Sequence, residues 1–302
     1  MEIAVTGSNG LIGSALITAL EAEGHGVRRL VRSGATGPGR VAWDPMAGTI
    51  DAAALEGVDA VVHLAGEGIG EKKWSPEQKR RILESRTLGT GLIARTIAGM
   101  AAKPSVFISA SAIGWYGGQR GDEVLTETSA APSPADFLAE VCAAWEAATE
   151  PAEAAGVRTV HLRTGIVLTP SGGALGRMIT PFKLGLGGRI ASGRQWMSWI
   201  SIDDEVGSIV HALSAEGLSG PVNATAPEPV TNADFTKTLG SVLHRPTLLP
   251  TPLAPLRAVY GRELVQALLV DGARVLPTAL EASGYRFAHR DLATALRAVT
   301  GA

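Results

Sequence analysis

The first thirteen residues constrain the fold more than any other part of the chain. A short apolar run, Ile3 to Val5, leads into Thr6-Gly7-Ser8-Asn9-Gly10-Leu11-Ile12-Gly13 and then into a helix-forming stretch from Ser14 to Glu23. This order predicts a strand, a glycine turn and the start of a helix. A helix start presents unpaired N–H groups and a partial positive charge, so the segment predicts an anion site.

The three glycines of this turn have separate expected roles. Gly7 lets the chain leave the strand tightly, Gly10 leaves room for a diphosphate, and Gly13 lets the helix pack closely on the strand. The spacing differs by one residue from the usual dinucleotide fingerprint, but the preceding strand and following helix supply the required context. A plain strand-turn-helix corner is the alternative. The residues expected to bind a dinucleotide here are Gly7, Asn9, Gly10, Leu11, Ile12 and Gly13.

Composition excludes several other classes of protein. The chain has 302 residues, 45% of them hydrophobic, which suits one large domain or a large and a small one. Its 27 Lys+Arg and 29 Asp+Glu give a net charge of -2, so no basic field attracts nucleic acid. Apolar runs such as 58–65 have strand length, and we expect neither a signal peptide nor a membrane span. The single cysteine, Cys142, and six histidines without ligand spacing predict a cytoplasmic protein without disulfide or metal.

Strands and helices alternate along the first half of the chain. Near-continuous apolar runs separated by helical stretches are typical of a parallel sheet covered on both faces. The sequence therefore predicts an α/β fold, a Rossmann-type doubly wound parallel sheet with ligands at the carboxyl ends of its strands. The expected strands are 26–32, 58–65, 104–109 and 157–163, and the expected helices are 75–100 and 134–155.

The second half is less regular and predicts a smaller lobe. Glycines interrupt residues 170–195, whereas 199–202 and 220–224 read as strands on either side of a helix that ends near Ala215. We expect a Rossmann domain over 1–165, joined by returning elements at about 199–226. Residues 166–302 then form a substrate lobe and a C-terminal helical segment, with a substrate cleft between the two parts.

The end of the second predicted strand indicates which dinucleotide is bound. An acidic residue about 20 positions past the glycines favours NAD, whereas arginine favours the 2′-phosphate of NADP. Arg32 lies 19 residues after Gly13 and is followed by Ser33, with no acidic residue between Glu23 and Asp44. This pattern predicts NADP(H). The alternative is that Arg32 and its neighbouring arginines are solvated residues at the sheet edge.

Several of these motifs together resemble the short-chain dehydrogenase/reductase superfamily in its extended, epimerase-like form. They are the glycine turn, Leu64-Ala65-Gly66, Ser109-Ala110-Ser111 before Tyr116-Gly117, and Trp199-Ile200-Ser201-Ile202-Asp203-Asp204. The chain looks most like the atypical branch labelled nucleoside-diphosphate-sugar epimerases. That branch has an extra C-terminal helical segment, which 260–287 resembles. The resemblance implies that Leu64, Ala65, Gly66 and Ser109 also contact the cofactor.

The resemblance also shows where the usual proton chemistry fails. Aligning Pro134 and Glu146 with the family pattern puts Leu138 at the catalytic tyrosine and Cys142 at the lysine. Leucine cannot transfer a proton, and a thiol does not replace the cation of lysine. Ser111 matches the family serine. The atypical branch shows the same departures.

Three residues are the catalytic candidates: Ser111, Tyr116 and Arg86. Tyr116 could be a replacement acid or only a wall residue of the nicotinamide pocket. Arg86, where the family commonly has asparagine, could hold an anionic group or developing oxyanion, or form a salt bridge. We expect Cys142 to pack as a small apolar residue.

Two main function classes remain open. The first is an NADP(H)-dependent oxidoreductase acting on a small molecule, such as a carbonyl compound or a sugar nucleotide, with a homodimer as one option for its assembly. The second is a dinucleotide-binding sensor or scaffold without turnover. Sugar-nucleotide epimerisation ranks third, because it needs the tyrosine that the chain lacks.

Overall fold

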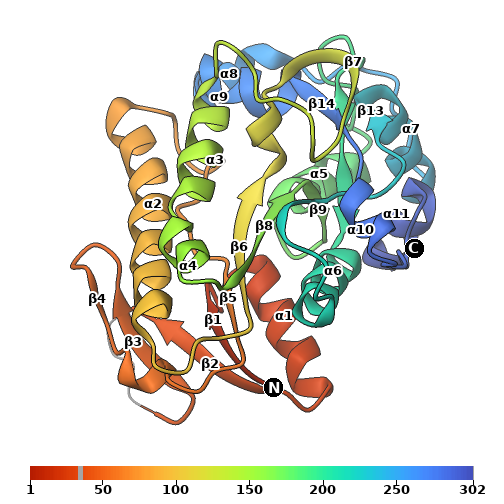
Figure 1. Ribbon diagram of the computed structural model, residues 1–302. Helices are drawn as coiled ribbons and strands as arrows, with labels where there is room; N and C mark the ends of the chain where they lie inside the picture. Colours follow the sequence, from red (N-terminus) through yellow and green to blue (C-terminus); the bar gives the residue numbers. More distant parts are fainter. Residues whose placement is uncertain (33–36, 302) are drawn as a thin grey trace.

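The computed structural model describes residues 1–32 and 37–301, and its centre is an eight-stranded sheet (Figure 1). The strand order is β12-β8-β6-β5-β1-β2-β3-β4, and every pairing is parallel except β3 with β4. This order confirms the predicted doubly wound α/β fold. The strands are β1 (Glu2–Thr6), β2 (Gly26–Val31), β3 (Arg40–Asp44), β4 (Thr49–Ile50), β5 (Ala60–His63), β6 (Val106–Ala112), β8 (Arg158–Thr164) and β12 (Gly220–Ala224).

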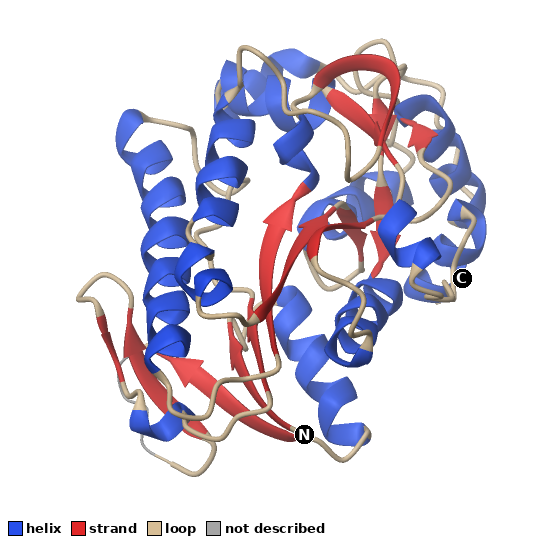
Figure 2. Ribbon diagram, in the orientation of Figure 1, coloured by secondary structure: helices blue, strands red, loops and turns tan. Residues whose placement is uncertain are grey.

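Helices cover both faces of this sheet (Figure 2). Successive side chains of β1 point to opposite faces, so Ile3 and Val5 join one buried cluster and Ala4 joins the other. Helices α1 (Leu11–Ala22) and α6 (Ile202–Ser214) pack on the first cluster. Helix α2 (Pro76–Gly99) packs on the second, beside α3 (Phe137–Ala147) and α4 (Glu150–Ala154).

The helix predicted over 134–155 is divided in two. It begins later than expected, because Asp136 caps α3 by accepting a hydrogen bond from the N–H of Ala139 at 2.9 Å. It is interrupted after Ala147, where Pro151 brings no N–H and lies in the first turn of α4. In residues 1–32 and 37–301, no helix has the length and apolar character needed to cross a membrane.

The rest of the chain builds a lobe above the carboxyl edge of the sheet (Figure 1). Three small strand pairs connect distant segments here: β9 (Ile166–Leu168) with β11 (Trp199–Ser201), β10 (Trp196–Met197) with β13 (Val230–Thr231), and β7 (Gln119–Leu125) with β14 (Gly272–Val275). The helices are α5 (Gly173–Lys183), α7 (Asn232–Val242), α8 (Leu253–Tyr260), α9 (Arg262–Val265), α10 (Thr278–Ala282) and α11 (Leu292–Thr300). Short turns of helix are η1 (Ala53–Leu55), η2 (Ile113–Tyr116) and η3 (Gln266–Val270). The division of the chain at residue 165 stays a prediction, although β12 returns to the main sheet.

Candidate functional site

The glycine turn joins β1 to α1 at the carboxyl edge of the sheet. Gly7 has a φ of +67°, and a Cβ there would lie 2.8 Å from the backbone carbon of Leu64 at the end of β5. A Cβ on Gly13 would lie 2.2 Å from the Gly7 carbonyl oxygen. These two glycines are therefore required for the backbones to approach so closely.

The start of α1 is open to a ligand. Asn9 and Gly10 are exposed, Gly10 is the N-cap without a side chain to satisfy the first N–H groups, and no acidic residue lies in the first turn. The N–H groups of Leu11 and Ile12 follow directly. The arrangement is what a phosphate needs at a helix N-terminus, so the residues of the turn fit a dinucleotide diphosphate.

The neighbouring end of β5 is held by a buried hydroxyl. Thr6 Oγ1 accepts hydrogen bonds from the N–H groups of Leu64 and Ala65, at 3.0 and 3.2 Å, and lies 2.7 Å from Nδ1 of His63. Burial, assisted by the charge of Arg86, lowers the pKa of His63 to about 3, so the ring is neutral. The Thr6 hydroxyl therefore holds the chain just after β5, where Leu64, Ala65 and Gly66 lie. Ser109 is buried on the adjacent strand β6, paired with His63.

Three arginines at the end of β2 differ in their surroundings. Arg28 donates to the carbonyl oxygens of Ala54 and Glu56, and Arg29 pairs with Glu21 at 2.8 Å. Arg32 is exposed, and within 1–32 and 37–301 no ion-pair partner lies near it. Ser33, which follows it, lies outside the described residues. That Arg32 meets a 2′-phosphate stays a prediction, and its exposed guanidinium is compatible with it.

Arg86 belongs to helix α2, and its side chain reaches the loop after β5. One of its nitrogens donates to the carbonyl oxygens of Glu67 and Ile82, at 3.0 and 3.1 Å, and the guanidinium lies 4.8 Å from the ring centre of Trp145. A Cβ on Gly66 would lie 3.3 Å from its central carbon. Burial lowers the pKa of Arg86 from its ordinary value. The guanidinium therefore borders the predicted cofactor edge and is stacked on an indole, without a salt bridge inside the described part of the chain.

Ser111 belongs to a buried network at the ends of β6, β8 and β12. Its hydroxyl donates to Glu146 at 2.7 Å, and both carboxylate oxygens of Glu146 accept from Arg163 at 2.8 Å. Arg163 donates to the Tyr116 hydroxyl at 3.0 Å, and that hydroxyl donates to Asn223 at 2.7 Å. The structure thus joins Ser111 and Tyr116 through a carboxylate and a guanidinium.

Tyr116 has no free face for a substrate. Its side chain is fully buried in η2, and burial raises the pKa of its phenol despite the nearby guanidinium of Arg163. The prediction that Tyr116 is the replacement acid stays untested, but its bonds fit a residue that holds strand ends together. Leu138 and Cys142 of α3 pack beside Gly114, whose missing Cβ would lie 3.2 Å from Leu138.

The thiol of Cys142 is enclosed in this packing. Burial, with the carboxylate of Glu146, raises the pKa of Cys142 to about 12. The thiol is therefore neutral at physiological pH and has no cation to offer where the family has lysine.

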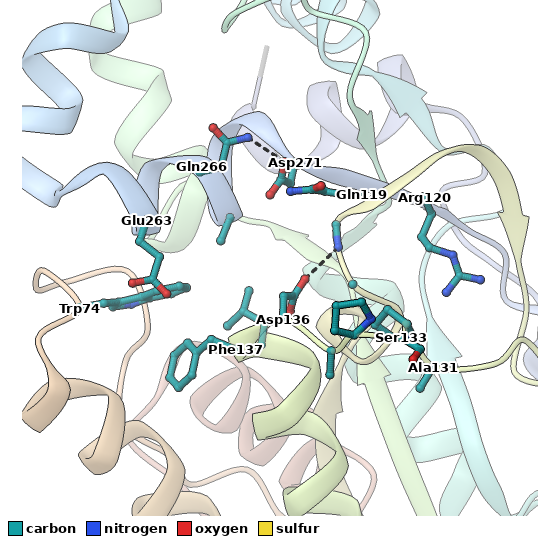
Figure 3. Close-up of a pocket in the computed structure, with 17 residues that line it drawn as sticks. Trp74, Gln119, Arg120, Ala131, Ser133, Asp136, Phe137, Glu263, Gln266 and Asp271 are labelled. Carbon is teal, nitrogen blue, oxygen red and sulfur yellow. Dashed lines mark hydrogen bonds between the residues drawn. The ribbon is translucent and has the colours of Figure 1, made fainter.

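A cavity of about 780 Å³ opens beside Leu138 (Figure 3). Trp74 and Phe137 form one wall, with ring centres 5.0 Å apart, and Asp136 and Asp271 project from opposite sides. Arg120 is turned away and pairs with Glu123 at 2.7 Å. The size of the cavity suits a small substrate.

Of the two tryptophans near the lobe junction, Trp199 is fully buried, whereas Trp196 donates a hydrogen bond to Asp122 at 2.8 Å.

Sequence reasoning missed the partners that link Ser111 and Tyr116, namely Glu146, Arg163 and Asn223. Arg163 carried the one available signal, because a charged residue inside an apolar strand needs a buried partner. Which partner it takes could not be read locally, since Glu146 lies 17 residues away and Ser111 a further 35 from Glu146 along the chain.

The strand order, the glycine turn and the open helix start define a Rossmann-type protein with a site for a dinucleotide. Residues 3–224 match the NAD dependent epimerase/dehydratase family, and residues 251–299 match a domain of unknown function (DUF1731). Because the first match spans most of the chain, the protein belongs to the NAD dependent epimerase/dehydratase family.

Relatives and solved structures support the same assignment. Epimerase family protein MT2273 of Mycobacterium tuberculosis is 44% identical, over 97% of this chain and 96% of its own. The crystal structure of human epimerase family protein SDR39U1 (isoform 2) with NADPH has a TM-score of 0.89 at 35% identity, covering 100% of this chain and 99% of that one. The nucleoside-diphosphate sugar epimerase from Corynebacterium glutamicum has a TM-score of 0.82 at 38% identity, covering 100% of this chain and 58% of that one. These likenesses confirm the predicted atypical, epimerase-like branch.

Proposed function

We propose that this protein is an NADP(H)-dependent oxidoreductase of the epimerase-like type, acting on a small molecule such as a carbonyl compound or a sugar nucleotide. The observation that carries the cofactor assignment is the open start of α1 behind Gly7 and Gly13, together with an exposed Arg32 that has no ion-pair partner among residues 1–32 and 37–301. The human relative solved with NADPH supports the same cofactor. When bound, the nicotinamide supplies or accepts a hydride.

The side chains of the chain have distinct proposed roles. Gly7, Asn9, Gly10, Leu11, Ile12 and Gly13 hold the diphosphate, Arg32 holds the 2′-phosphate, and Leu64, Ala65, Gly66 and Ser109 line the remaining cofactor edge. Ser111 meets the reacting oxygen, and Arg86 polarises that region without itself losing a proton. Tyr116 keeps Arg163 in place, which makes it a positioning residue.

The cavity beside Leu138 is the proposed substrate site. Trp74 and Phe137 offer apolar contact to a carbonyl compound or a sugar ring. True epimerisation of a sugar nucleotide is a weaker candidate. It needs reversible oxidation of a hydroxyl by a tyrosine and a lysine, and Leu138 and Cys142 stand in their places. Cytoplasmic location and a homodimer stay predictions.

A dinucleotide-binding sensor without turnover is the second candidate. It is favoured by a specific observation: every hydroxyl proton in the Ser111 network already has a protein acceptor. A site whose donors are all engaged can hold a cofactor without transferring protons to a substrate.

The experiment that tests the proposal measures binding and turnover separately. Calorimetry with NADPH and NADH should show tighter binding of NADPH, and binding of neither, or preference for NADH, contradicts the cofactor assignment. A panel of aldehydes, ketones and sugar nucleotides is then followed by absorbance of NADPH. Strong NADPH binding with no oxidation above background across that panel would favour the sensor.

A further inference from the structure

Glu146 lies between Ser111 and His161. It lies in the last turn of α3, and its Oε1 accepts from Ser111 at 2.7 Å while its Oε2 lies 3.9 Å from Nδ1 of His161. His161 and Arg163 are two residues apart in β8, so both side chains project from the same face of the sheet, beneath Glu146. The carboxylate therefore lies between the site and a histidine.

From His161 the polar groups continue to solvent. Its Nε2 lies 2.9 Å from Thr149 Oγ1 and 3.1 Å from Glu153 Oε1. The exposed fraction of the side chain rises from 11% at Glu146 and 13% at His161 to 45% at Glu153. His161 and Glu153 also line a surface hollow of about 490 Å³ beside β12. The groups thus form a series from a buried serine to water, with one gap of 3.9 Å between Glu146 and His161.

The other bonds of the network fix the direction of the serine proton. The side-chain nitrogen of Asn223 donates to the carbonyl of Leu276 at 2.9 Å, so its oxygen is the acceptor for Tyr116. Arg163 only donates, and Glu146 receives its two bonds. Ser111 consequently gives its proton to Glu146, and in the described part of the chain no protein group donates to its oxygen.

We propose that Ser111, Glu146 and His161 form a proton path that replaces the missing tyrosine and lysine. The path rests on the oxidoreductase function proposed above. When an alcohol is oxidised, its O–H proton passes to Ser111 Oγ as the serine proton passes to Glu146. The carbon–hydrogen bond breaks, its electron pair leaves as hydride to NADP⁺, and the carbonyl bond forms. Glu146 passes the proton to His161 once the 3.9 Å gap closes, and Glu153 and water receive it. Reduction follows the reverse order.

The charges around Glu146 suit a group that holds a proton only in passing. Arg163 contacts both of its oxygens and cannot lose its own proton, so the charge of the carboxylate is balanced in the resting state. His161 is the member of the series that lies beside the surface hollow, which makes it the group that exchanges protons with water. Ser111 is the catalytic residue of the path, and Glu146 and His161 act through it.

The test uses para-nitrobenzaldehyde with NADPH and para-nitrobenzyl alcohol with NADP⁺ on the full chain. His161→Ala should lower kcat about tenfold in both directions while KM and the Kd of NADPH change by less than about twofold. Imidazole added to the buffer should restore kcat, because it can enter the hollow and take the place of the missing ring. His161→Gln, which keeps a polar amide beside Glu153, should show the same loss, and Glu150→Gln on the exposed face of α4 should show none.

A second measurement needs no substrate. The ring carbon and nitrogen chemical shifts of His161, measured by NMR at one pH, should differ between Glu146→Gln and the unmodified chain, because the variant loses the negative charge 3.9 Å from Nδ1. Unchanged shifts, or full kcat in folded His161→Ala, overturn the path while leaving the oxidoreductase intact. A loss of kcat that imidazole does not restore also overturns it. An unmodified chain that binds NADPH but converts neither probe, nor any member of the wider panel, overturns the oxidoreductase function and the path with it.

Discussion

The glycine turn and the Ser111 network lie at the same edge of the sheet and are built in opposite ways. The turn is defined by what is missing: side chains at Gly7 and Gly13, a capping group on α1, and an acidic residue in its first turn. In the network, by contrast, Ser111, Glu146 and Arg163 satisfy one another's hydrogen bonds with little access to water. The first is an open receptor for an anion, and the second is a preformed structural unit.

This difference predicts which property of the protein a substitution in each region alters. The turn has unpaired N–H groups, which a bound phosphate would satisfy, so alterations there should act on cofactor affinity. The network has buried charge that only its own members compensate, so alterations there should act first on folding. The predictions that follow test this division.

Loss of Arg163 should have the largest effect. Arg163→Met keeps much of the volume but leaves Glu146 as an uncompensated, nearly buried charge, and we expect the free energy of unfolding to fall by about 3–5 kcal/mol. Urea denaturation followed by circular dichroism measures this. The double variant Arg163→Met/Glu146→Gln, which also removes the charge, should recover part of the loss. If the double variant is less stable than Arg163→Met, the argument from buried charge is wrong.

The contrast between the regions also explains how much the sequence revealed. Strands β1, β5, β6 and β8 and the turn after β1 were predicted because each is encoded by a continuous local pattern. Strand β3 alternates exposed and buried residues at the sheet edge and was missed, since the search was for apolar runs. Helix α5 was missed because its N-terminal glycines read as a broken loop.

The Ser111 network could not be predicted for a different reason. Its bonds join residues on separate strands and on α3, and nothing in the local pattern around Ser111 or Arg163 specifies the partner. The cofactor residues were predicted from a motif, whereas the partners of the catalytic candidates are set by tertiary packing.

Glu205 sharpens the comparison, because it is a buried glutamate without a guanidinium. It accepts from Thr164 at 2.8 Å, and burial raises its pKa from 4.5 to about 8. The folded state therefore holds this proton more tightly than the unfolded state. Its contribution to stability is complete below about pH 4.5 and is lost as the pH rises through about 8, by at most about 1.4 kcal/mol per pH unit.

Glu205→Gln should remove this loss. The amide keeps an acceptor for Thr164 but has no proton to release, so the variant should exceed the unmodified chain in stability near pH 8 and above. Thermal unfolding at a series of pH values measures the difference. Asp203→Asn on the exposed side of α6 is the matched control and should leave the pH profile unchanged. Parallel profiles for Glu205→Gln and the unmodified chain would show that Glu205 is ionised in the folded state.

In the open region, Arg32→Ala should act on affinity and not on folding. Loss of one charge-assisted contact should weaken NADPH binding by about 1.5–3 kcal/mol and leave NADH binding nearly unchanged. Calorimetry with both dinucleotides measures the selectivity. Arg29→Ala is the control, because Arg29 lies in the preceding strand β2 and its side chain pairs with Glu21. Equal weakening of the binding of both dinucleotides would place the 2′-phosphate elsewhere.

Gly10→Val should weaken the binding of both dinucleotides, because the valine side chain enters the path of the diphosphate.

The smallest effect is expected for Tyr116→Phe, which separates a positioning role from an acid role. The substitution removes a hydroxyl that bonds to Arg163 and Asn223 and leaves the aromatic packing in place, so stability should fall by about 1–2 kcal/mol. NADPH affinity should be kept, because the bonds of the Tyr116 hydroxyl, to Arg163 and Asn223, involve no residue of the glycine turn. If Tyr116 only positions Arg163, turnover falls modestly and its pH profile keeps its shape. A near-complete loss of turnover in a stably folded variant, with Cys142→Ala fully active beside it, would instead return Tyr116 to the role of proton donor. Comparing kcat with the free energy of unfolding in the same preparations decides between the positioning role and the acid role. Substitution of a structural residue lowers both quantities, whereas substitution of an acid lowers kcat alone.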